Sequence, residues 1–297
     1  MMKDKRLAVL LISLVFTLLP SLSFCLDLES VAEEIHKKYS VPKDYSLHVL
    51  KRAKTLPNVK AFVNRVANSP EKVFTFDRFV ILFVSQERIK EGVNFIKNHR
   101  KLCGLIYKKY GVKPSIIAAI LNIETNFGKV KLKTDALDAL YTLAQFSKRK
   151  SYFLYELENF IAYTYKHKID PFSVKGSITG ALGLPQFMPS NIDKYGVDFN
   201  HNGLNLDEIE DACASIANYL VHFGYKRNKP IAEFIKMDKK PCKSNKQIVC
   251  FKFSNGRYAY YRVYSSFWAL VRYNGTINYA LAAYLLSKEI DKNLSPN

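Results

Sequence analysis

The sequence predicts a mainly helical fold with one small antiparallel β element, and three observations support this. Apolar residues recur at helical spacing along most of the chain, as in RIKEGVNFIKNHRKLCGLIYKKYG. The stretch CFKFSNGRYAYYRVY instead alternates apolar and polar residues around Asn255-Gly256, a pair typical of hairpin turns. The chain does not alternate strands with helices, which argues against Rossmann-like and barrel folds.

Turn-forming residues divide the helical part into segments. Residues 28–112 are expected to form helices separated by SVPKDY, TLPNVK and NSPEK. Pro114 begins an apolar helix that is expected to reach Phe127, with Gly128 at its end. Further helices are expected over 134–146 with Thr134 or Asp135 as the cap, over SYFLYELENFIAYTYKHK, near Ser190, over DACASIANYLVHFG and over NYALAAYLLSKEI.

Composition indicates a globular protein with an anionic partner. The 297 residues are 48% hydrophobic and 24% charged, and the formal net charge is +19. An excess of cations favours nucleic acid, an acidic membrane surface or an anionic carbohydrate polymer. Charge alone does not choose among these partners.

The N-terminus predicts export. Lys3, Lys5 and Arg6 precede the apolar run LAVLLISLVFTLL, and small residues follow. This pattern describes a secretory signal over residues 1–25, because the run is shorter than the roughly 20 residues of a membrane-spanning helix. LSFC also resembles a lipoprotein signal with Cys25 as the lipidated residue, although Phe24 is bulky for it. We therefore expect a periplasmic protein, with plain cleavage, outer-membrane attachment through Cys25 and a retained anchor helix left as alternatives. Export argues against nucleic acid as the partner.

Four further cysteines remain in the exported chain. Cys242 and Cys250 could close a small loop, whereas Cys103 and Cys213 lie in apolar helical patterns that suit buried thiols. Their spacing does not suggest a zinc site.

The motif IETNFG places a carboxylate, Glu124, where a core helix would carry an apolar residue. Glu124 is in helical register with Ile117, Ile120 and Leu121. Burial disfavours the charged form of a carboxyl group and raises its pKa, which suits a general acid at neutral pH. The alternative is that the last turn reaches solvent and Glu124 is simply hydrated.

Four motifs occur together in a fixed order: IETNFG, GSITGALGLPQFMPSN, ANYLVHFGY and RYNGTINYA. The glycine-rich second motif lacks the GK[ST] of a phosphate-binding loop. In this order and spacing the motifs resemble the type B family of lytic murein transglycosylases, over about residues 28–289. The resemblance implies a lysozyme-like helical core at 113–225, after an N-terminal helical region at 26–112. A small β element at 226–264 and a C-terminal segment at 265–297, which completes the catalytic groove, would follow.

The resemblance also implies an activity. Family members cleave the β-1,4 bond between N-acetylmuramic acid and N-acetylglucosamine in peptidoglycan without water, and form 1,6-anhydromuramyl ends. Glu124 matches the single catalytic glutamate. Ordinary glycosidases use two carboxylates, but here the sugar's own 6-hydroxyl would attack, so one glutamate can serve as acid and then base. No cofactor is needed for this chemistry, and a monomer acting on peptidoglycan glycan strands is expected.

The same resemblance implies a set of substrate-binding residues. Lys148 stands where the family often has a second arginine. The expected contacts to the glycan or its peptide are Arg149, Tyr152, Ser177, Gln186, Phe187, Met188, Tyr219, Tyr273 and Asn274.

Some relatives carry a calcium loop where this chain has DFNHNGLNLDEIED, residues 198–211. The expected ligands are Asp198, Asn200, Asn202, the Leu204 carbonyl and Asp211. Two Asp-type ligands are asparagine here, and the loop is one residue shorter than in those relatives. A structural calcium ion and a loop that is stable without metal both remain open.

Two rival functions follow from the same residues. A lysozyme-type hydrolase would need a second carboxylate facing Glu124, and Asp135 and Asp138 are the nearest in sequence. A non-catalytic peptidoglycan-binding protein would not need Glu124 at all.

Overall fold

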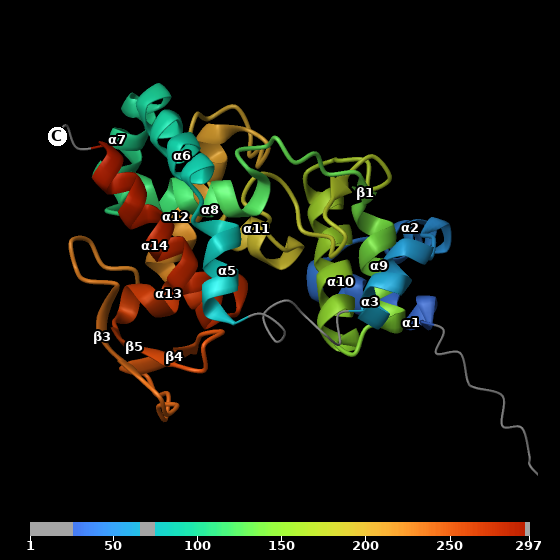
Figure 1. Cartoon of the computed structure of the whole chain (residues 1–297). Helices are drawn as coiled ribbons and strands as arrows, with labels where there is room; N and C mark the ends of the chain where they lie inside the picture. The colour runs from blue at the N-terminus through green and yellow to red at the C-terminus, as the bar shows by residue number, and fades with distance from the viewer. Residues whose placement is uncertain (1–25, 66–74, 295–297) are drawn as a thin grey trace, which may run out of the picture.

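The computed structural model describes residues 26–65 and 75–294, and these residues form the mainly helical fold that the sequence predicts (Figure 1). The expected signal segment, with Cys25, lies outside the described residues. None of the helices in the described ranges is long and apolar enough to span a bilayer. The helices are α1 (Leu28–Tyr39), α2 (Lys43–Arg52), α3 (Pro57–Arg65), α5 (Phe76–Phe83), α6 (Gln86–Asn98), α7 (Arg100–Tyr110), α8 (Pro114–Thr125), α9 (Ala136–Phe146), α10 (Lys150–Lys166), α11 (Pro189–Tyr195), α12 (Ile209–His222), α13 (Ser265–Asn274) and α14 (Ile277–Leu294).

Two apolar cores organise these helices. One core is built by α5–α8, α12–α14 and a three-stranded sheet, and the other by α1–α3 with α9–α11. Figure 1 shows α8 in one lobe and α10 in the neighbouring lobe, with α11 between them. The expected N-terminal region, 26–112, is shared between the cores, because α1 packs on α10 and α3 on α9, whereas α6 packs on α8 and α14.

The apolar helix α8 is the centre of the first core. Pro114 occupies its first turn, where a missing N–H costs nothing, and every residue from Ile116 to Asn122 is buried. The helix ends at Thr125, two residues before the expected Phe127. Asn126, Phe127 and Gly128 all have positive φ, at 48°, 54° and 81°, so the chain leaves the helix through a left-handed turn.

The β element is an antiparallel sheet with strand order β3-β5-β4, formed by β3 (Ala232–Asp238), β4 (Ile248–Lys252) and β5 (Tyr258–Val263). The predicted hairpin around Asn255-Gly256 is present, but its connection is one residue longer than the two-residue turn that this pair indicates. Phe253 donates its N–H to the Arg257 carbonyl, so residues 254–256 form a three-residue connection with Gly256 at φ 76°. Strand β3 and the two-residue strands β1 (Thr134–Asp135) and β2 (Lys175–Gly176) were not expected from the sequence.

All four described cysteines are free thiols in the structure. Cys103 in α7 and Cys213 in α12 are buried. Cys242 and Cys250 lie side by side, with the Cys242 N–H 3.1 Å from the Cys250 Sγ atom.

Candidate active site

Glu124 lies one residue before the end of α8, where the buried helix reaches its left-handed turn. Its side chain is partly buried, and burial raises the pKa of its carboxyl group from 4.5 to about 7. Near neutral pH this carboxyl group can therefore both donate and accept a proton. This outcome favours the burial interpretation of Glu124 over a fully hydrated helix end.

Tyr279, from α14, is the hydrogen-bond partner of Glu124. Its hydroxyl donates to Oε1 of Glu124 at 2.7 Å and favours the charged form, which partly offsets the effect of burial on the Glu124 pKa. Burial and the neighbouring carboxyl group raise the pKa of Tyr279 well above its ordinary value, so the phenol stays protonated. Tyr279 lies within the motif RYNGTINYA but was not among the site residues expected from the sequence.

An aromatic wall extends from Tyr279 away from the carboxyl group. Tyr273 stacks parallel to Tyr279, with ring centroids 6.3 Å apart and planes 5° apart. The ring of Tyr219 meets Tyr273 edge-on at 5.2 Å, and the buried Phe187 contacts both. The Tyr273 hydroxyl donates to the Pro185 carbonyl at 2.7 Å and so fixes the glycine-rich loop to α13. Three residues expected to bind substrate, Tyr219, Tyr273 and Phe187, thus lie together, and Tyr273 connects them to Tyr279, the partner of Glu124.

The glycine-rich loop positions its own polar side chains through short-range hydrogen bonds. The Ser177 hydroxyl accepts the Ala181 N–H at 3.1 Å and holds the turn at Gly180, where φ is 79°. Gln186 has φ 53°, and its amide nitrogen donates to the Gly183 carbonyl at 2.9 Å. Met188 is the residue before α11.

The start of α10 forms the far end of the aromatic wall. The Arg149 guanidinium lies 4.0 Å above the ring of Tyr152, a favourable cation–π arrangement. Burial and the nearby Glu156 raise the pKa of Tyr152, which packs on the same core as Phe187 and Tyr219. Glu156 is 2% exposed and accepts the N–H and hydroxyl of Ser190 at 2.9 and 2.8 Å, which joins α10 to α11.

The remaining expected contact, Asn274, is the last residue of α13 and is exposed.

The carboxylates considered for a hydrolase have partners elsewhere. Asp135 pairs with Lys175, and Asp138 accepts the backbone N–H of Lys54 at 2.8 Å. Among the described groups, burial and Tyr279 account for the pKa of Glu124, without a contribution from another carboxylate.

Comparison with known proteins identifies the family of this chain. Residues 25–249 match the model of the transglycosylase SLT domain. The chain belongs to this transglycosylase family. It is 30% identical over 235 residues to membrane-bound lytic murein transglycosylase B of Escherichia coli, a match covering 70% of this chain and 65% of that relative. The chain thus spans slightly less than two thirds of that protein's length.

Solved lytic transglycosylase structures share the fold of this family member. The E. coli enzyme Slt35 in complex with bulgecin A has a TM-score of 0.77 at 27% identity, covering 89% of this chain and 92% of the other. SltB1 from Pseudomonas aeruginosa has a TM-score of 0.77 at 26% identity, covering 90% and 98%. Slt35 has also been solved in complex with calcium, with a TM-score of 0.76 at 26% identity, covering 89% and 92%. The expected resemblance to type B lytic transglycosylases and the lysozyme-like fold are confirmed.

In this member of the family, the loop expected to bind calcium is closed by hydrogen bonds. Asp198 accepts the backbone N–H groups of Asn202 and Gly203 at 3.2 and 3.0 Å. Asp211 is fully buried, and its two oxygens accept the N–H groups of Phe199 and Asn205, both at 2.8 Å. Both oxygens of Asp211 therefore tie the loop to α12.

Glu208, which the sequence analysis did not name, faces the other expected ligands. The side-chain amides of Asn200 and Asn202 donate to its Oε2 atom at 3.0 and 3.1 Å. A half-turn of each amide would present oxygen in place of nitrogen, and a cation between these oxygens and Glu208 would offset their repulsion. The described residues contain no cluster of three His, Cys, Asp or Glu side chains suited to a metal. By residue type, Asp198, Asn200, Asn202 and Glu208 nevertheless offer the carboxylate and amide oxygens that calcium prefers as ligands. The Leu204 side chain packs on the second core.

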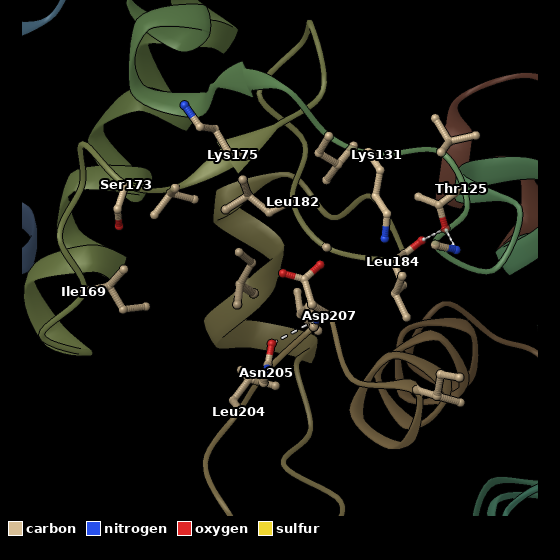
Figure 2. Close-up of a pocket in the computed structure, with 18 of the residues that line it drawn as sticks. Thr125, Lys131, Ile169, Ser173, Lys175, Leu182, Leu184, Leu204, Asn205 and Asp207 are labelled. Carbon is tan, nitrogen blue, oxygen red and sulfur yellow. Dashed lines mark hydrogen bonds between the residues drawn. The ribbon is translucent and has the colours of Figure 1, made fainter.

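A cavity of about 770 Å³ lies behind the glycine-rich loop (Figure 2). Thr125, residues 182–184 and Asp207 are among the residues that line it, whereas Glu124 and the expected substrate-binding residues are not. Figure 2 shows Lys131 and Asp207 pointing toward each other across it. This space is therefore separate from the candidate active site.

Proposed function

We propose that this protein is a peptidoglycan lytic transglycosylase that cleaves the β-1,4 bond after N-acetylmuramic acid and forms 1,6-anhydromuramyl ends. Glu124 is the single general acid and base. The observation that supports this most directly is one carboxyl group with a pKa near neutrality, held by a tyrosine and not influenced by a second carboxylate among the described residues. Membership of the transglycosylase family supports the same reaction.

The geometry suits both steps of the reaction. Tyr279 occupies Oε1 of Glu124, which leaves Oε2 to deliver its proton to the leaving glycosidic oxygen. The resulting carboxylate is stabilised by the Tyr279 hydrogen bond and then accepts the proton of the attacking 6-hydroxyl group. Because acid, base and nucleophile come from one side chain and the substrate, the chemistry requires no cofactor.

The aromatic wall suits a glycan strand. The rings of Tyr219, Tyr273 and Tyr152 offer apolar faces and hydroxyl groups, which bind sugar rings through stacking and hydrogen bonds. Arg149, at the end of the wall, and the net charge of +19 suit the carboxylates of peptidoglycan peptides. Ser177, Gln186, Met188 and Asn274 complete the proposed set of contacts.

Three further properties belong to the proposal. The protein is exported to the periplasm as a monomer, and Cys25 is the candidate for a lipid anchor to the outer membrane. A calcium ion bound to the 198–211 loop is structural. Asp198, Asn200, Asn202, the Leu204 carbonyl and Glu208 are its ligands, with Glu208 in the place first expected for Asp211.

Mass spectrometry of the products released from purified peptidoglycan tests the proposal. Wild-type protein is expected to release anhydromuramyl ends, which are lighter by one water than reducing ends. Glu124→Gln keeps the shape of the side chain but cannot act as a general acid or base. This variant is expected to bind peptidoglycan and release no products. Reducing muramic ends would identify a hydrolase, and undiminished release by Glu124→Gln would remove Glu124 from the mechanism.

A further inference from the structure

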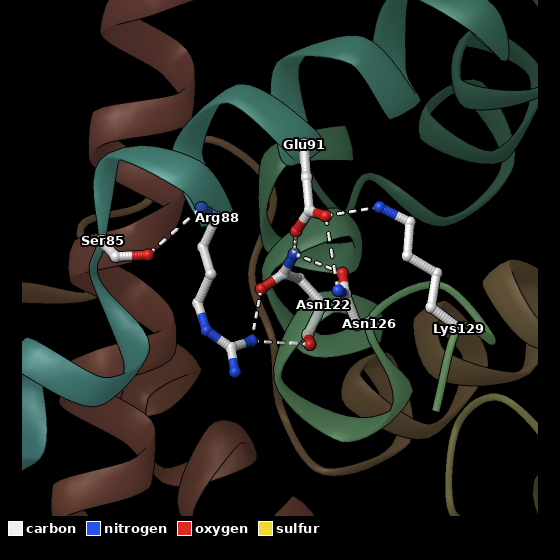
Figure 3. Close-up of polar contacts among 6 residues, drawn as sticks. All are labelled: Ser85, Arg88, Glu91, Asn122, Asn126 and Lys129. Atoms are coloured by element: carbon white, nitrogen blue, oxygen red, sulfur yellow. Dashed lines mark hydrogen bonds and ion pairs between the residues drawn. The ribbon is translucent and has the colours of Figure 1, made fainter. Parts of the chain in front are cut away.

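A polar cluster centred on the buried Asn122 lies on the side of α8 opposite to Glu124 (Figure 3). Asn122 and Asn126 are two residues before and two residues after Glu124. At about 100° per helical residue, a two-residue step points to the opposite face of the helix. Asn122 therefore faces α6 when Glu124 faces Tyr279 on α14. Asn126 lies just beyond the helix, and its side chain reaches α6 through a hydrogen bond to Glu91.

Asn122 forms the centre of this cluster. It is fully buried, yet each of its side-chain polar atoms has a partner. Arg88 of α6 donates to the Asn122 side-chain oxygen at 2.6 Å and to its backbone carbonyl at 2.8 Å. The Asn122 amide nitrogen donates to Glu91 Oε2 at 3.1 Å and to the Asn126 side-chain oxygen at 3.2 Å. A buried amide with all its partners fixes the position of its backbone.

Glu91 connects this cluster to the left-handed turn. Its Oε1 atom accepts the Asn126 amide at 3.3 Å and pairs with Lys129, as Figure 3 shows. Phe127, the next residue of the turn, stacks on Phe95 of α6 with ring centroids 4.6 Å apart. Helix α6 thus contacts three positions around the end of α8 through polar and aromatic groups.

We propose that Glu91, with Arg88, Asn122 and Asn126, is a positioning group that fixes the rotation of the last turn of α8 and thereby aims the Glu124 carboxyl group. The cluster holds the turn from the α6 side, and the Tyr279 hydroxyl holds the carboxyl group from the α14 side. These residues do not touch the substrate. They act through Glu124, so this inference rests on the proposed function.

The physical consequence of losing Glu91 is a looser helix end. Asn122 and Asn126 would lose an acceptor, and the left-handed turn would be free to rotate and admit water around Glu124. A small misplacement of a catalytic group lowers the rate of the chemical step by roughly 100-fold. Added water would also favour the charged form of Glu124 and move its pKa toward the ordinary range.

The test is the pH profile of kcat, with KM, for release of soluble products from peptidoglycan strands by Glu91→Ala. We expect kcat to fall by about 10-fold or more, KM to change by less than about twofold, and the basic limb of the kcat profile to move to lower pH. Glu91→Gln keeps one acceptor oxygen and should restore part of kcat and the position of the limb. If Glu91→Ala does not fold, Asn126→Gly is the substitute variant, because glycine keeps the left-handed backbone at this position. It should move the basic limb of the kcat profile to lower pH in the same way.

Two control variants separate positioning from general stability. Lys129→Ala removes only the exposed ion pair with Glu91 and should leave kcat nearly unchanged. Glu158→Gln neutralises a more deeply buried carboxylate, which pairs with Lys38 at 3.0 Å in the other core. It should lower thermal stability without moving the pH profile.

The outcomes distinguish this inference from the proposed function. If Glu124→Gln is inactive and Glu91→Ala keeps its kcat and pH profile, the positioning role is overturned and the function stands. The positioning role is likewise overturned if Glu91→Ala only lowers the melting temperature, as Glu158→Gln does. If Glu124→Gln remains active, the proposed function itself fails.

Discussion

The raised pKa of Glu124 predicts a measurable dependence of stability on pH. Its carboxyl group titrates at about 7 in the folded protein, against an ordinary value of 4.5. Because the folded pKa is the higher one, this group stabilises the fold when it is protonated. That stabilisation is present at low pH and is lost as the pH rises through about 7.

The magnitude follows from the same two values. A pKa unit corresponds to about 1.4 kcal/mol, so raising the pH from about 5 to about 8 should cost about 2.5 kcal/mol of unfolding free energy through Glu124 alone. The side chain is partly exposed, and solvent screening reduces the expectation to about 2 kcal/mol. Glu124→Gln does not titrate and should not show this loss.

The assay is guanidinium unfolding of wild type and Glu124→Gln at about pH 5 and about pH 8, followed by circular dichroism and by the fluorescence of Trp268. Subtracting the change in unfolding free energy of Glu124→Gln from that of the wild type removes the contribution of all other titrating groups. The wild type should lose about 2 kcal/mol more than the variant on going to high pH. Glu87→Gln, on an exposed side chain of α6, is the matched control and should behave as wild type. A difference below about 0.5 kcal/mol would refute the raised pKa and with it the dual acid–base role.

Three other outcomes follow from the site and its surroundings. Tyr279→Phe removes the hydrogen bond that favours the charged form of Glu124, so the basic limb of the kcat profile should move to higher pH, as a rate titration would show. Asp135→Asn and Asp138→Asn should each release anhydromuramyl products, measured by mass spectrometry, at a rate within about threefold of wild type. The reason is that neither carboxylate contributes to the pKa of Glu124. A loss of product with either variant would point to a second catalytic carboxylate. Calcium should raise the melting temperature in differential scanning fluorimetry and Glu208→Gln should reduce that rise, whereas an equal rise in both proteins would exclude Glu208 as a ligand.

The local sequence predicted the elements whose signal lies within a few residues. Periodicity located α8, and Asn255-Gly256 located the hairpin between β4 and β5. Prediction from the local sequence failed where contacts with another segment determine the secondary structure. The edge strand β3 pairs with β5 across a long connection, and its exposed Phe234 and Ile235 do not give a clear alternating pattern. The end of α8 was placed two residues late because Asn126 and Phe127 adopt positive φ against α6.

The sequence by itself determined the helical class, the proposed catalytic carboxylate and the family, because these depend on residue type, order and spacing. Tertiary structure alone decided the two properties that suit Glu124 to acid–base chemistry, which are its raised pKa and its hydrogen-bond partner. Its pKa depends on how much water the surrounding helices exclude, and its partner Tyr279 lies 155 positions away in the chain. The same holds for Glu91 and Glu208. The role of each depends on groups brought within hydrogen-bond distance by packing, and spacing along a sequence does not report such distances.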